Sequence, residues 1–333
     1  MTRVCVVGAG AWGTAIANLT AVKASVVLWV HGEDTSMMLR EVRENRLYLP
    51  GVRLRDNIEL TSDLLSAWRS ADAVILAVPM QRLRSMFCKL APELFRLGVP
   101  LLNLSKGLEL ETHLRASQLL CEDLELSDYD HYAALSGPNF APEIARNMPA
   151  ATVIASRRSG TRNHFQELLS GGSLRVYTSA DLVGVELGGA LKNVYAVAAG
   201  LSDGLGFGDS SKASLIVRSL HELVKVATAL GADSATMNGL AGAGDLIATS
   251  FSRLSRNRMA GEAIGKGASA SDLQTSQRTV IEGLPTLQAL AKIAEQSTID
   301  LPVVRQLHGI VAGSVTPLVG LQRLMSRETK SEF

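Results

Sequence analysis

The chain opens with an apolar run that leads into a glycine-rich turn and then into a helix-like segment. The run Val4–Val7 precedes the sequence GAGAWG, which is followed by a helical pattern over Thr14–Leu19 and by a second apolar run. In this order Gly8 permits a tight turn, Gly10 lets a diphosphate approach the backbone, and Gly13 lets the helix pack closely on the strand. The free N–H groups at the start of the helix favour an anion. The pattern therefore predicts a dinucleotide-binding unit at the start of the chain.

The rest of the first half alternates short Val-, Ile- and Leu-rich runs with amphipathic stretches, which is typical of βαβ units that build a parallel sheet. The expected strands are 4–7, 26–30, 73–77, 100–104, 132–135 and 152–155. Beyond about Asp181, Ala and Leu recur at helical spacing, and the clearest expected helices are 182–201, 212–230 and 284–294. The sequence therefore predicts an α/β fold. We expect a Rossmann-type doubly wound parallel sheet over residues 1–180, a mainly α-helical second domain over 181–325, and a polar tail over 326–333.

The composition of the chain argues against several classes of binding partner. Lys and Arg (33) nearly balance Asp and Glu (32), which argues against the concentrated basic face by which proteins bind nucleic acid or a membrane surface. Cys5, Cys88 and Cys121 lie far apart without metal-binding spacing, so no metal site is expected. The apolar stretches fall short of the roughly 20 residues that a membrane span needs, and the N-terminus lacks a signal-peptide pattern. We expect a cytoplasmic protein that acts on a small molecule.

The end of the second expected strand usually distinguishes NAD from NADP. An acid there accepts a hydrogen bond from the ribose 2′-hydroxyl and repels a 2′-phosphate. This chain places His31 at that point, with Glu33 and Asp34 just after it. His31 could stack on adenine, meet a 2′-phosphate or simply lie on the surface, whereas Glu33 could bind the ribose of NAD. The sequence leaves NAD(H) and NADP(H) both open.

Later clusters place polar or charged side chains where chemistry is expected. Lys106 follows a predicted strand, at the edge where an open parallel sheet binds its ligand, and Ser136–Ala141 (SGPNFA) follows another. Lys192 lies in an otherwise apolar helical segment, where a charge is costly unless it has partners or lines a cavity, so it is a candidate for proton transfer. The segment Ser252–Arg258 holds three arginines and two serines, which suit a phosphate dianion at a helix start or, equally, a solvated basic helix.

Taken together, these motifs resemble the NAD(P)-dependent glycerol-3-phosphate dehydrogenases of bacterial type. The resemblance covers nearly the whole chain, and several motifs in one order are more specific than any one of them. The matching segments are GAGAWGTAIA, NRLYLPG at 45–51, LSKGLE, SGPNFA, GGALKNVYAVAAG, GLAGAGDL, SRNR and VIEG at 280–283.

The resemblance implies that dihydroxyacetone phosphate and sn-glycerol 3-phosphate are interconverted by hydride transfer, a reaction that supplies glycerophospholipid biosynthesis. It implies that Lys192 accepts the proton in the oxidation direction, with Asn193 and Asp245 orienting the ammonium or the substrate. The residues expected to hold the substrate are Lys106, Gly137, Asn139, Asp245, Ser255, Arg256 and Asn257. The residues expected to contact the cofactor are Gly8, Gly10, Ala11, Trp12, Gly13, His31, Lys106, Ala141, Arg256, Val280 and Glu282.

Three positions depart from the family pattern. Position 139 is more often Thr or Ser, position 11 is often Ser, and position 12 is more often Tyr or Phe. Asn139 keeps the capacity to donate and accept hydrogen bonds, whereas Ala11 lacks a hydroxyl that could bind phosphate. We therefore expect substrate contact in altered form and a slightly weaker affinity for the cofactor.

Two other interpretations remain open at this point. A 3-hydroxyacid or 6-phosphogluconate-like dehydrogenase would also pair a dinucleotide domain with a helical domain that carries a catalytic Lys, although the SRN cluster after GLAGAGDL favours a phosphate over a carboxylate. A cofactor-binding redox sensor would bind NADH without turning over a phosphorylated ketone. The apolar faces of the expected helical domain predict a homodimer.

Overall fold

The computed structural model describes residues 2–125, 129–276, 280–326, 328 and 331. The chain folds as two compact units. The first comprises Met1–Lys106 and Leu114–Glu186, and the second comprises Gly107–His113 and Leu187–Phe333. Residues 327, 329, 330, 332 and 333 of the expected polar tail lie outside the described part of the chain.

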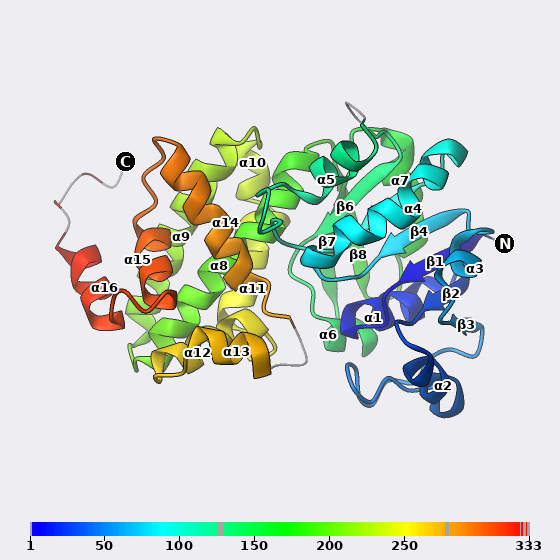
Figure 1. Ribbon diagram of the computed structural model, residues 1–333, viewed down its shortest axis with the longest axis horizontal. Coiled ribbons are helices and arrows are strands. Elements are labelled where there is room, and N and C mark those ends of the chain that lie inside the picture. Colours follow the sequence, from blue (N-terminus) through cyan, green and yellow to red (C-terminus); the bar gives the residue numbers. More distant parts are fainter. Residues whose placement is uncertain (1, 126–128, 277–279, 327, 329–330, 332–333) are drawn as a thin grey trace. The chain divides into compact units, whose positions relative to one another are not determined.

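The first unit is built on an eight-stranded sheet in the order β3-β2-β1-β4-β5-β6-β7-β8 (Figure 1). The strands are β1 (Arg3–Val7), β2 (Ser25–Trp29), β3 (Ile58–Thr61), β4 (Ala73–Leu76), β5 (Leu101–Asn103), β6 (Tyr132–Ser136), β7 (Ala150–Ala155) and β8 (Leu174–Ser179). From β1 the chain builds outward first through β2 and β3 and then, on the other side, from β4 onward. This reversal defines a doubly wound sheet whose switch point lies between β1 and β4, the place where such sheets bind ligands.

The six predicted strands and the doubly wound sheet are confirmed, and one pair of strands departs from the predicted parallel arrangement. Strands β6 and β7 run antiparallel, and β8 then pairs parallel to β7. The prediction also missed β3 and β8. Both have alternating buried and exposed residues, with Glu59 and Arg175 exposed, because they are edge strands. Continuous apolar runs are typical of strands that are buried on both faces, and edge strands with one exposed face lack such runs.

Helices flank the sheet on both sides (Figure 1). Ile16 of α1 and Phe165 of α7 share one core cluster with Val4, Val6 and Leu28 of the strands, so these two helices cover the same face. The helical elements of the first unit are α1 (Ala11–Thr20), α2 (Glu33–Val42), α3 (Leu64–Trp68), the 3₁₀ turn η1 (Met80–Arg82), α4 (Leu83–Leu97), α5 (Ala116–Asp123), α6 (Ala141–Ala145) and α7 (Ser159–Leu169).

In the described residues the second unit is helical, and the three helices predicted in it are confirmed as α8, α9 and α14. Its helices are α8 (Leu182–Gly204), whose first turn belongs to the first unit, α9 (Asp209–Ala229), α10 (Ser234–Met237), the π-helical turn η2 (Leu240–Gly244), α11 (Asp245–Phe251), α12 (Arg256–Gly265), α13 (Ala270–Ser276), α14 (Gly283–Gln296), α15 (Pro302–Val311) and α16 (Pro317–Met325). Within the described chain, α8 alone has the length and hydropathy of a membrane span. Because 89% of its apolar window is buried, its apolar character is explained by a place in the core.

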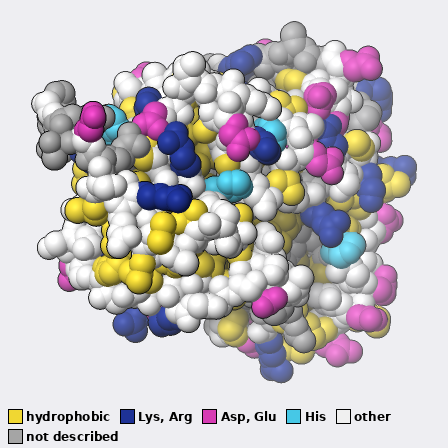
Figure 2. Space-filling model, turned by 60° about the vertical axis from the view of Figure 1, so that its left-hand side comes forward, with side chains coloured by type: hydrophobic (Ala, Val, Ile, Leu, Met, Phe, Trp, Pro, Cys, Tyr) yellow, Lys and Arg dark blue, Asp and Glu magenta, His cyan; other side chains and the backbone are white. Residues whose placement is uncertain are grey.

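One face of the molecule shows how its charged side chains are distributed (Figure 2). Figure 2 shows one face, on which basic and acidic side chains are interspersed and hydrophobic side chains gather on one part. This distribution is the one expected from nearly equal numbers of basic and acidic residues.

Candidate functional site

The glycine-rich turn between β1 and α1 has the geometry that its sequence predicts. Gly8 has a φ of +108°, and a Cβ atom there would lie 2.6 Å from the carbonyl oxygen of Ala77, which follows β4. A Cβ on Gly13 would lie 1.9 Å from the carbonyl oxygen of Gly8, so only glycine lets α1 start this close to the strand. At Gly10 no atom other than those of the glycine and its two chain neighbours lies within 4 Å of the Cβ position, and the space there is open. The turn therefore fits a diphosphate placed over Gly10 at the switch point of the sheet.

The first turn of α1 is packed against a second predicted cofactor segment. Gly10 is the N-cap of α1, and its carbonyl accepts the first intrahelical hydrogen bond, from Thr14 N at 2.9 Å. The N–H groups of the first turn have no partner within the helix and favour an anion. Ala11 and Trp12 pack against a small core cluster that contains Ala141. The structure thus brings together three residues that the family resemblance assigns to the cofactor.

The end of β2 leaves the choice between NAD and NADP open. His31 is exposed, with its ring centroid 5.6 Å from that of Trp29. Glu33 begins α2 and accepts a hydrogen bond from the Ser62 hydroxyl at 2.7 Å. Both residues are exposed just after β2, so both cofactor alternatives drawn from the sequence stay open.

The loops after β5 and β6 meet at the carboxyl ends of these strands. The Lys106 ammonium donates to the carbonyl oxygen of Gly137 at 3.2 Å. Gly137 has a φ of +138°, and a Cβ there would lie 3.0 Å from Cα of Thr152, so glycine is required. The Asn139 amide donates to the Thr152 hydroxyl at 2.9 Å. The structure therefore places the predicted substrate residues Lys106, Gly137 and Asn139 in one cluster, with Thr152 as a partner that the sequence did not indicate.

Lys192 is held in a buried polar centre of the second unit. Its ammonium lies 2.9 Å from the Asp245 carboxylate and donates to the Thr249 hydroxyl at 2.7 Å. Thr249 in turn donates to Asp245 at 2.9 Å. The three side chains form a closed triangle in which the buried charge has a counter-charge and a hydrogen-bond partner, as a buried ammonium requires. Thr249 was not predicted, although its place one helical turn after Asp245 was a usable signal.

Close glycine packing explains how α8 and α11 bring Lys192 and Asp245 together. A Cβ on Gly188 would lie 2.5 Å from the carbonyl oxygen of Ala241, so the backbone of η2 touches α8 at that point. Lys192 lies one turn after Gly188, and Asp245 lies four residues after Ala241, so both side chains fall just beyond the contact. The π-helical turn η2 is itself a feature that is frequent at functional sites.

Asn257 joins three of the sequence motifs. Its amide donates to the side-chain oxygen of Asn193 at 2.8 Å, and its own oxygen accepts from Gly283 N at 2.9 Å. A Cβ on Gly283 would lie 2.6 Å from the carbonyl oxygen of Asn193. The predicted substrate residue Asn257 therefore already has two protein partners, and the neighbour of Lys192 is fixed through it.

The start of α12 carries the predicted phosphate-binding residues. The Ser255 hydroxyl caps the helix by accepting from Arg258 N at 3.1 Å. Arg256 is the first helical residue, where a cation is disfavoured by the helix dipole unless an anion accompanies it. Arg256 is exposed, yet desolvation by the surrounding protein lowers the pKa of its guanidinium, and the carboxylate of Glu282 counteracts this effect. Val280 is exposed and precedes Glu282 at the head of α14.

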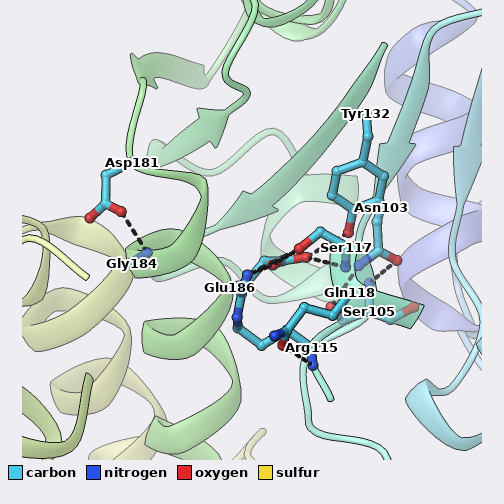
Figure 3. Close-up of polar contacts among 9 residues, drawn as sticks. All are labelled: Asn103, Ser105, Arg115, Ser117, Gln118, Tyr132, Asp181, Gly184 and Glu186. Atoms are coloured by element: carbon cyan, nitrogen blue, oxygen red, sulfur yellow. Dashed lines mark hydrogen bonds and ion pairs between the residues drawn. The ribbon is translucent and has the colours of Figure 1, made fainter. Parts of the chain in front are cut away.

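A buried ionic network fixes the first turn of α8 to the first unit (Figure 3). The Glu186 carboxylate accepts from the Tyr132 hydroxyl at 2.7 Å, from Ser117 N at 2.9 Å and hydroxyl at 2.6 Å, and from Arg115 at 2.6 Å. Its side chain is 5% exposed. No sequence motif indicated this network, which holds the start of the helix that carries Lys192.

The three cysteines are free, and Cys5 is buried in β1. Burial raises the pKa of the Cys5 thiol to about 12, and the charge of Arg3 opposes this effect. Across the described residues, no group of three or more His, Cys, Asp or Glu side chains is placed to hold a metal ion. Cys5 therefore packs in the core of the first unit.

Comparison with known proteins gives matches over nearly the whole chain. A family model described as the NAD-dependent glycerol-3-phosphate dehydrogenase N-terminus matches residues 3–161, and the corresponding C-terminal model matches residues 181–322. A glycerol-3-phosphate dehydrogenase (NAD(P)+) of Pelotomaculum thermopropionicum is 42% identical, over 99% of this chain and 95% of its own. One from Syntrophomonas wolfei is 41% identical, over 100% and 97%. The crystal structure of the Coxiella burnetii glycerol-3-phosphate dehydrogenase superposes with a TM-score of 0.91 at 31% identity, covering 98% of this chain and 99% of the other.

Proposed function

Since the chain belongs to the family of NAD-dependent glycerol-3-phosphate dehydrogenases, we propose that it interconverts dihydroxyacetone phosphate and sn-glycerol 3-phosphate, with NAD(H) or NADP(H) as the hydride carrier. The observation that carries the proposal within this chain is the buried triangle of Lys192, Asp245 and Thr249. In the cell the product would supply glycerophospholipid biosynthesis.

The first unit supplies the cofactor site in this proposal. When bound, the nicotinamide group gives or accepts the hydride. Gly8, Gly10 and Gly13 shape a turn that leaves room for the diphosphate at the start of α1. The residues proposed to complete the site are Ala11, Trp12, His31, Lys106 and Ala141, together with Arg256, Val280 and Glu282 of the second unit.

Lys192 moves the proton. In the reduction direction its ammonium donates a proton to the ketone oxygen while C2 receives the hydride, and in the oxidation direction the neutral amine accepts the hydroxyl proton. Asp245 and Thr249 hold the amine in one orientation through contacts of 2.9 and 2.7 Å. General acid–base catalysis of this kind contributes a factor of about 10² to 10⁴ in rate.

The substrate phosphate is proposed to bind at the start of α12. Ser255 and Arg256 are both at this helix end, where N–H groups and a guanidinium favour a dianion. A second cluster of polar groups that we assign to the substrate consists of Lys106, Gly137 and Asn139. Asn257 donates one amide hydrogen to Asn193, and we assign its second amide hydrogen to the substrate. Binding energy from the remote phosphate then aligns C2 for hydride transfer.

The two alternatives are weaker on particular observations. A 3-hydroxyacid substrate lacks the phosphate that the basic start of α12 favours. A 6-phosphogluconate-like substrate carries a phosphate, but the family models that match residues 3–161 and 181–322 are those of glycerol-3-phosphate dehydrogenases. A redox sensor would not need a buried ammonium held by a carboxylate and a hydroxyl, an arrangement that is costly to bury and suits proton transfer.

The test is dihydroxyacetone phosphate reduction followed at 340 nm with NADH and, separately, with NADPH. Wild-type protein should oxidise at least one of the two, and Lys192→Ala should lower kcat by roughly 10² or more. Lys212→Ala is the matched control, because Lys212 is also buried and pairs with Asp203 at 2.8 Å. It should lower stability while retaining most of kcat. Turnover near wild type in Lys192→Ala would refute the assignment, and wild-type protein that binds NADH without turnover would favour the sensor.

Assembly and location are part of the proposal. We place the enzyme in the cytoplasm as a homodimer. Three free cysteines suit a reducing compartment, and Ile247, Phe251 and Leu254 expose apolar surface on the second unit. Light scattering of purified protein at micromolar concentration distinguishes a dimer from a monomer.

A further inference from the structure

The segment NRLYLPG at 45–51 matches the family but has no role in the function proposed above. It follows α2, and its first residue, Asn45, is 1% exposed. We propose that Asn45 is a positioning residue that sets the glycine-rich turn in the orientation needed to bind the cofactor diphosphate. The inference rests on the cofactor site of the proposed function and adds a residue to it.

Asn45 uses its whole side chain to join its own segment to the turn. The amide donates to the carbonyl oxygen of Ala9 at 2.8 Å and to the hydroxyl of Thr14 at 2.8 Å. The side-chain oxygen accepts from Tyr48 N at 3.2 Å. Ala9 lies between the first two glycines of the turn, and Thr14 lies in the second turn of α1. One buried amide therefore holds both sides of Gly10.

The bond to Ala9 determines where the next N–H group points. The carbonyl of Ala9 and the N–H of Gly10 belong to the same peptide group, which is planar and trans, so they point in opposite directions. With the carbonyl held by Asn45, the Gly10 N–H is directed away from Asn45. Because no atom other than those of Gly10 and its two chain neighbours lies within 4 Å of the Gly10 Cβ position, an anion can approach the turn there.

The segment that carries Asn45 is itself fixed by packing. Leu49 is 1% exposed and lies with Val52, Ala15 and Ala141 in a core cluster, against which Ala11 and Trp12 also pack. Leu49 N donates to the Asn45 carbonyl at 2.8 Å, which closes a helical turn behind the side chain. The position of the Asn45 side chain is therefore fixed by the packing of Leu49 and by this backbone hydrogen bond.

Asn45→Ala tests the inference in the full-length protein, with ADP-ribose as the probe because it carries the diphosphate without the nicotinamide. Removing both donors should raise the Kd for ADP-ribose, measured by calorimetry, by roughly tenfold or more, and the Kd for NADH by the same factor. The KM for dihydroxyacetone phosphate at saturating NADH should stay within about twofold, a split that a general loss of structure would not produce.

Asn57→Ala is the matched control. Asn57 donates its amide to the carbonyl oxygen of Ala21 at 2.8 Å, at the opposite end of the same helix. Its loss should leave the Kd for ADP-ribose unchanged. An equal weakening in Asn45→Ala and Asn57→Ala would mean that any loosening of α1 is sufficient, and would overturn the role given to Asn45.

Asn45→Asp keeps the side-chain size and the acceptor for Tyr48 N, so it provides a second variant if alanine does not fold. Its weakening of ADP-ribose binding should persist at 1 M salt, where the repulsion between its charge and the diphosphate is screened. A wild-type Kd in either folded variant under these conditions would refute the inference. Failure of the proposed function is separate, because wild-type protein would then bind ADP-ribose without reducing dihydroxyacetone phosphate.

Discussion

Lys192 and Asp245 depend on each other because both are almost out of contact with water. Their side chains are 9% and 3% exposed. Loss of either partner would remove the counter-charge of a buried charge, a change that typically costs about 3–5 kcal/mol. A substitution of Asp245 would therefore change both the free energy of unfolding and kcat, and the two effects could not be separated. Thr249 is neutral and its hydroxyl touches both groups, so it offers a cleaner way to disturb only the orientation of the ammonium.

Thr249→Val should lower kcat for dihydroxyacetone phosphate reduction by about tenfold, because the ammonium loses its hydrogen bond to the Thr249 hydroxyl and about 1 kcal/mol of orienting interaction. The KM for the cofactor should not change. Thr228→Val makes the same chemical change at an exposed hydroxyl that donates to Val224 O at 2.7 Å, and it should have wild-type kcat. A pair of variants with equal kcat would remove Thr249 from the catalytic centre.

Cys5 and Cys88 should differ in reactivity. Cys5 is fully buried and its thiol has a pKa raised to about 12, whereas Cys88 is exposed. Because the thiolate is the reactive form, iodoacetamide at pH 8 should alkylate Cys88 in the native protein and leave Cys5 unmodified. Peptide mass spectrometry measures both sites, and denatured protein should be modified at all three cysteines. Equal native rates at Cys5 and Cys88 would contradict the burial of β1.

At the scale of elements, α8 and α12 touch backbone to backbone. A Cβ on Gly200 of α8 would lie 1.8 Å from the carbonyl oxygen of Arg258, and one on Gly261 of α12 would lie 1.9 Å from that of Val197. Helices approach this closely only where both present glycine. Since Lys192 lies on α8 and Arg256 begins α12, this contact sets the position of the proposed phosphate site relative to the proton-transfer group.

Gly261→Ala should destabilise the second unit. Alanine gains about 1 kcal/mol in helix propensity, but the clash with backbone requires the helices to separate, and overpacking typically costs about 1–3 kcal/mol or more. We expect a net loss of roughly 1–2 kcal/mol in urea unfolding, together with a raised KM for dihydroxyacetone phosphate. Gly208→Ala is the control, because its Cβ position has no described atom within 4 Å. A variant Gly261→Ala as stable as Gly208→Ala would contradict the close contact.

At the scale of the whole molecule, several weak acids are buried in their neutral form. Desolvation raises the pKa of Tyr129 to about 12, and it raises the pKa of Tyr132 and of Tyr195 well above the ordinary value of 10.0. The Glu186 carboxylate adds to the effect at Tyr132, and Glu222 adds to it at Tyr195. Both units therefore contain groups that must stay protonated for the fold to persist.

Alkaline pH should destabilise the protein in proportion to these groups. The folded state keeps protons that the unfolded chain releases near pH 10, so their stabilisation is complete below that pH and is lost as pH rises toward the folded pKa values. Each group contributes a slope of up to about 1.4 kcal/mol per pH unit. Urea unfolding between pH 9 and 11.5 should show a falling midpoint, and Tyr132→Phe should reduce the slope. The exposed Tyr177→Phe is the control. An unchanged slope in Tyr132→Phe would contradict the neutral buried phenol.

The local elements were largely predictable, and the errors share one cause. The turn after β1, the apolar strands and the long helices α8, α9 and α14 follow from glycine spacing and hydrophobic periodicity. The edge strands β3 and β8 were missed and the direction of β7 was wrong, because these depend on which neighbour a strand finds. At the candidate site the motif residues were named in advance, but the roles of Thr249 and Glu186 were not.

The sequence by itself determined most of the elements, the family and the residues proposed to carry the chemistry, since each is written in short segments whose spacing has a local physical meaning. Only the tertiary structure decided which polar atoms meet. Asn45 and Ala9 are 36 positions apart, and Lys192 and Thr249 are 57 apart. Hydrogen bonds act over about 3 Å and carry no trace in the intervening sequence, so pairs of this kind appear only when the backbone has been folded.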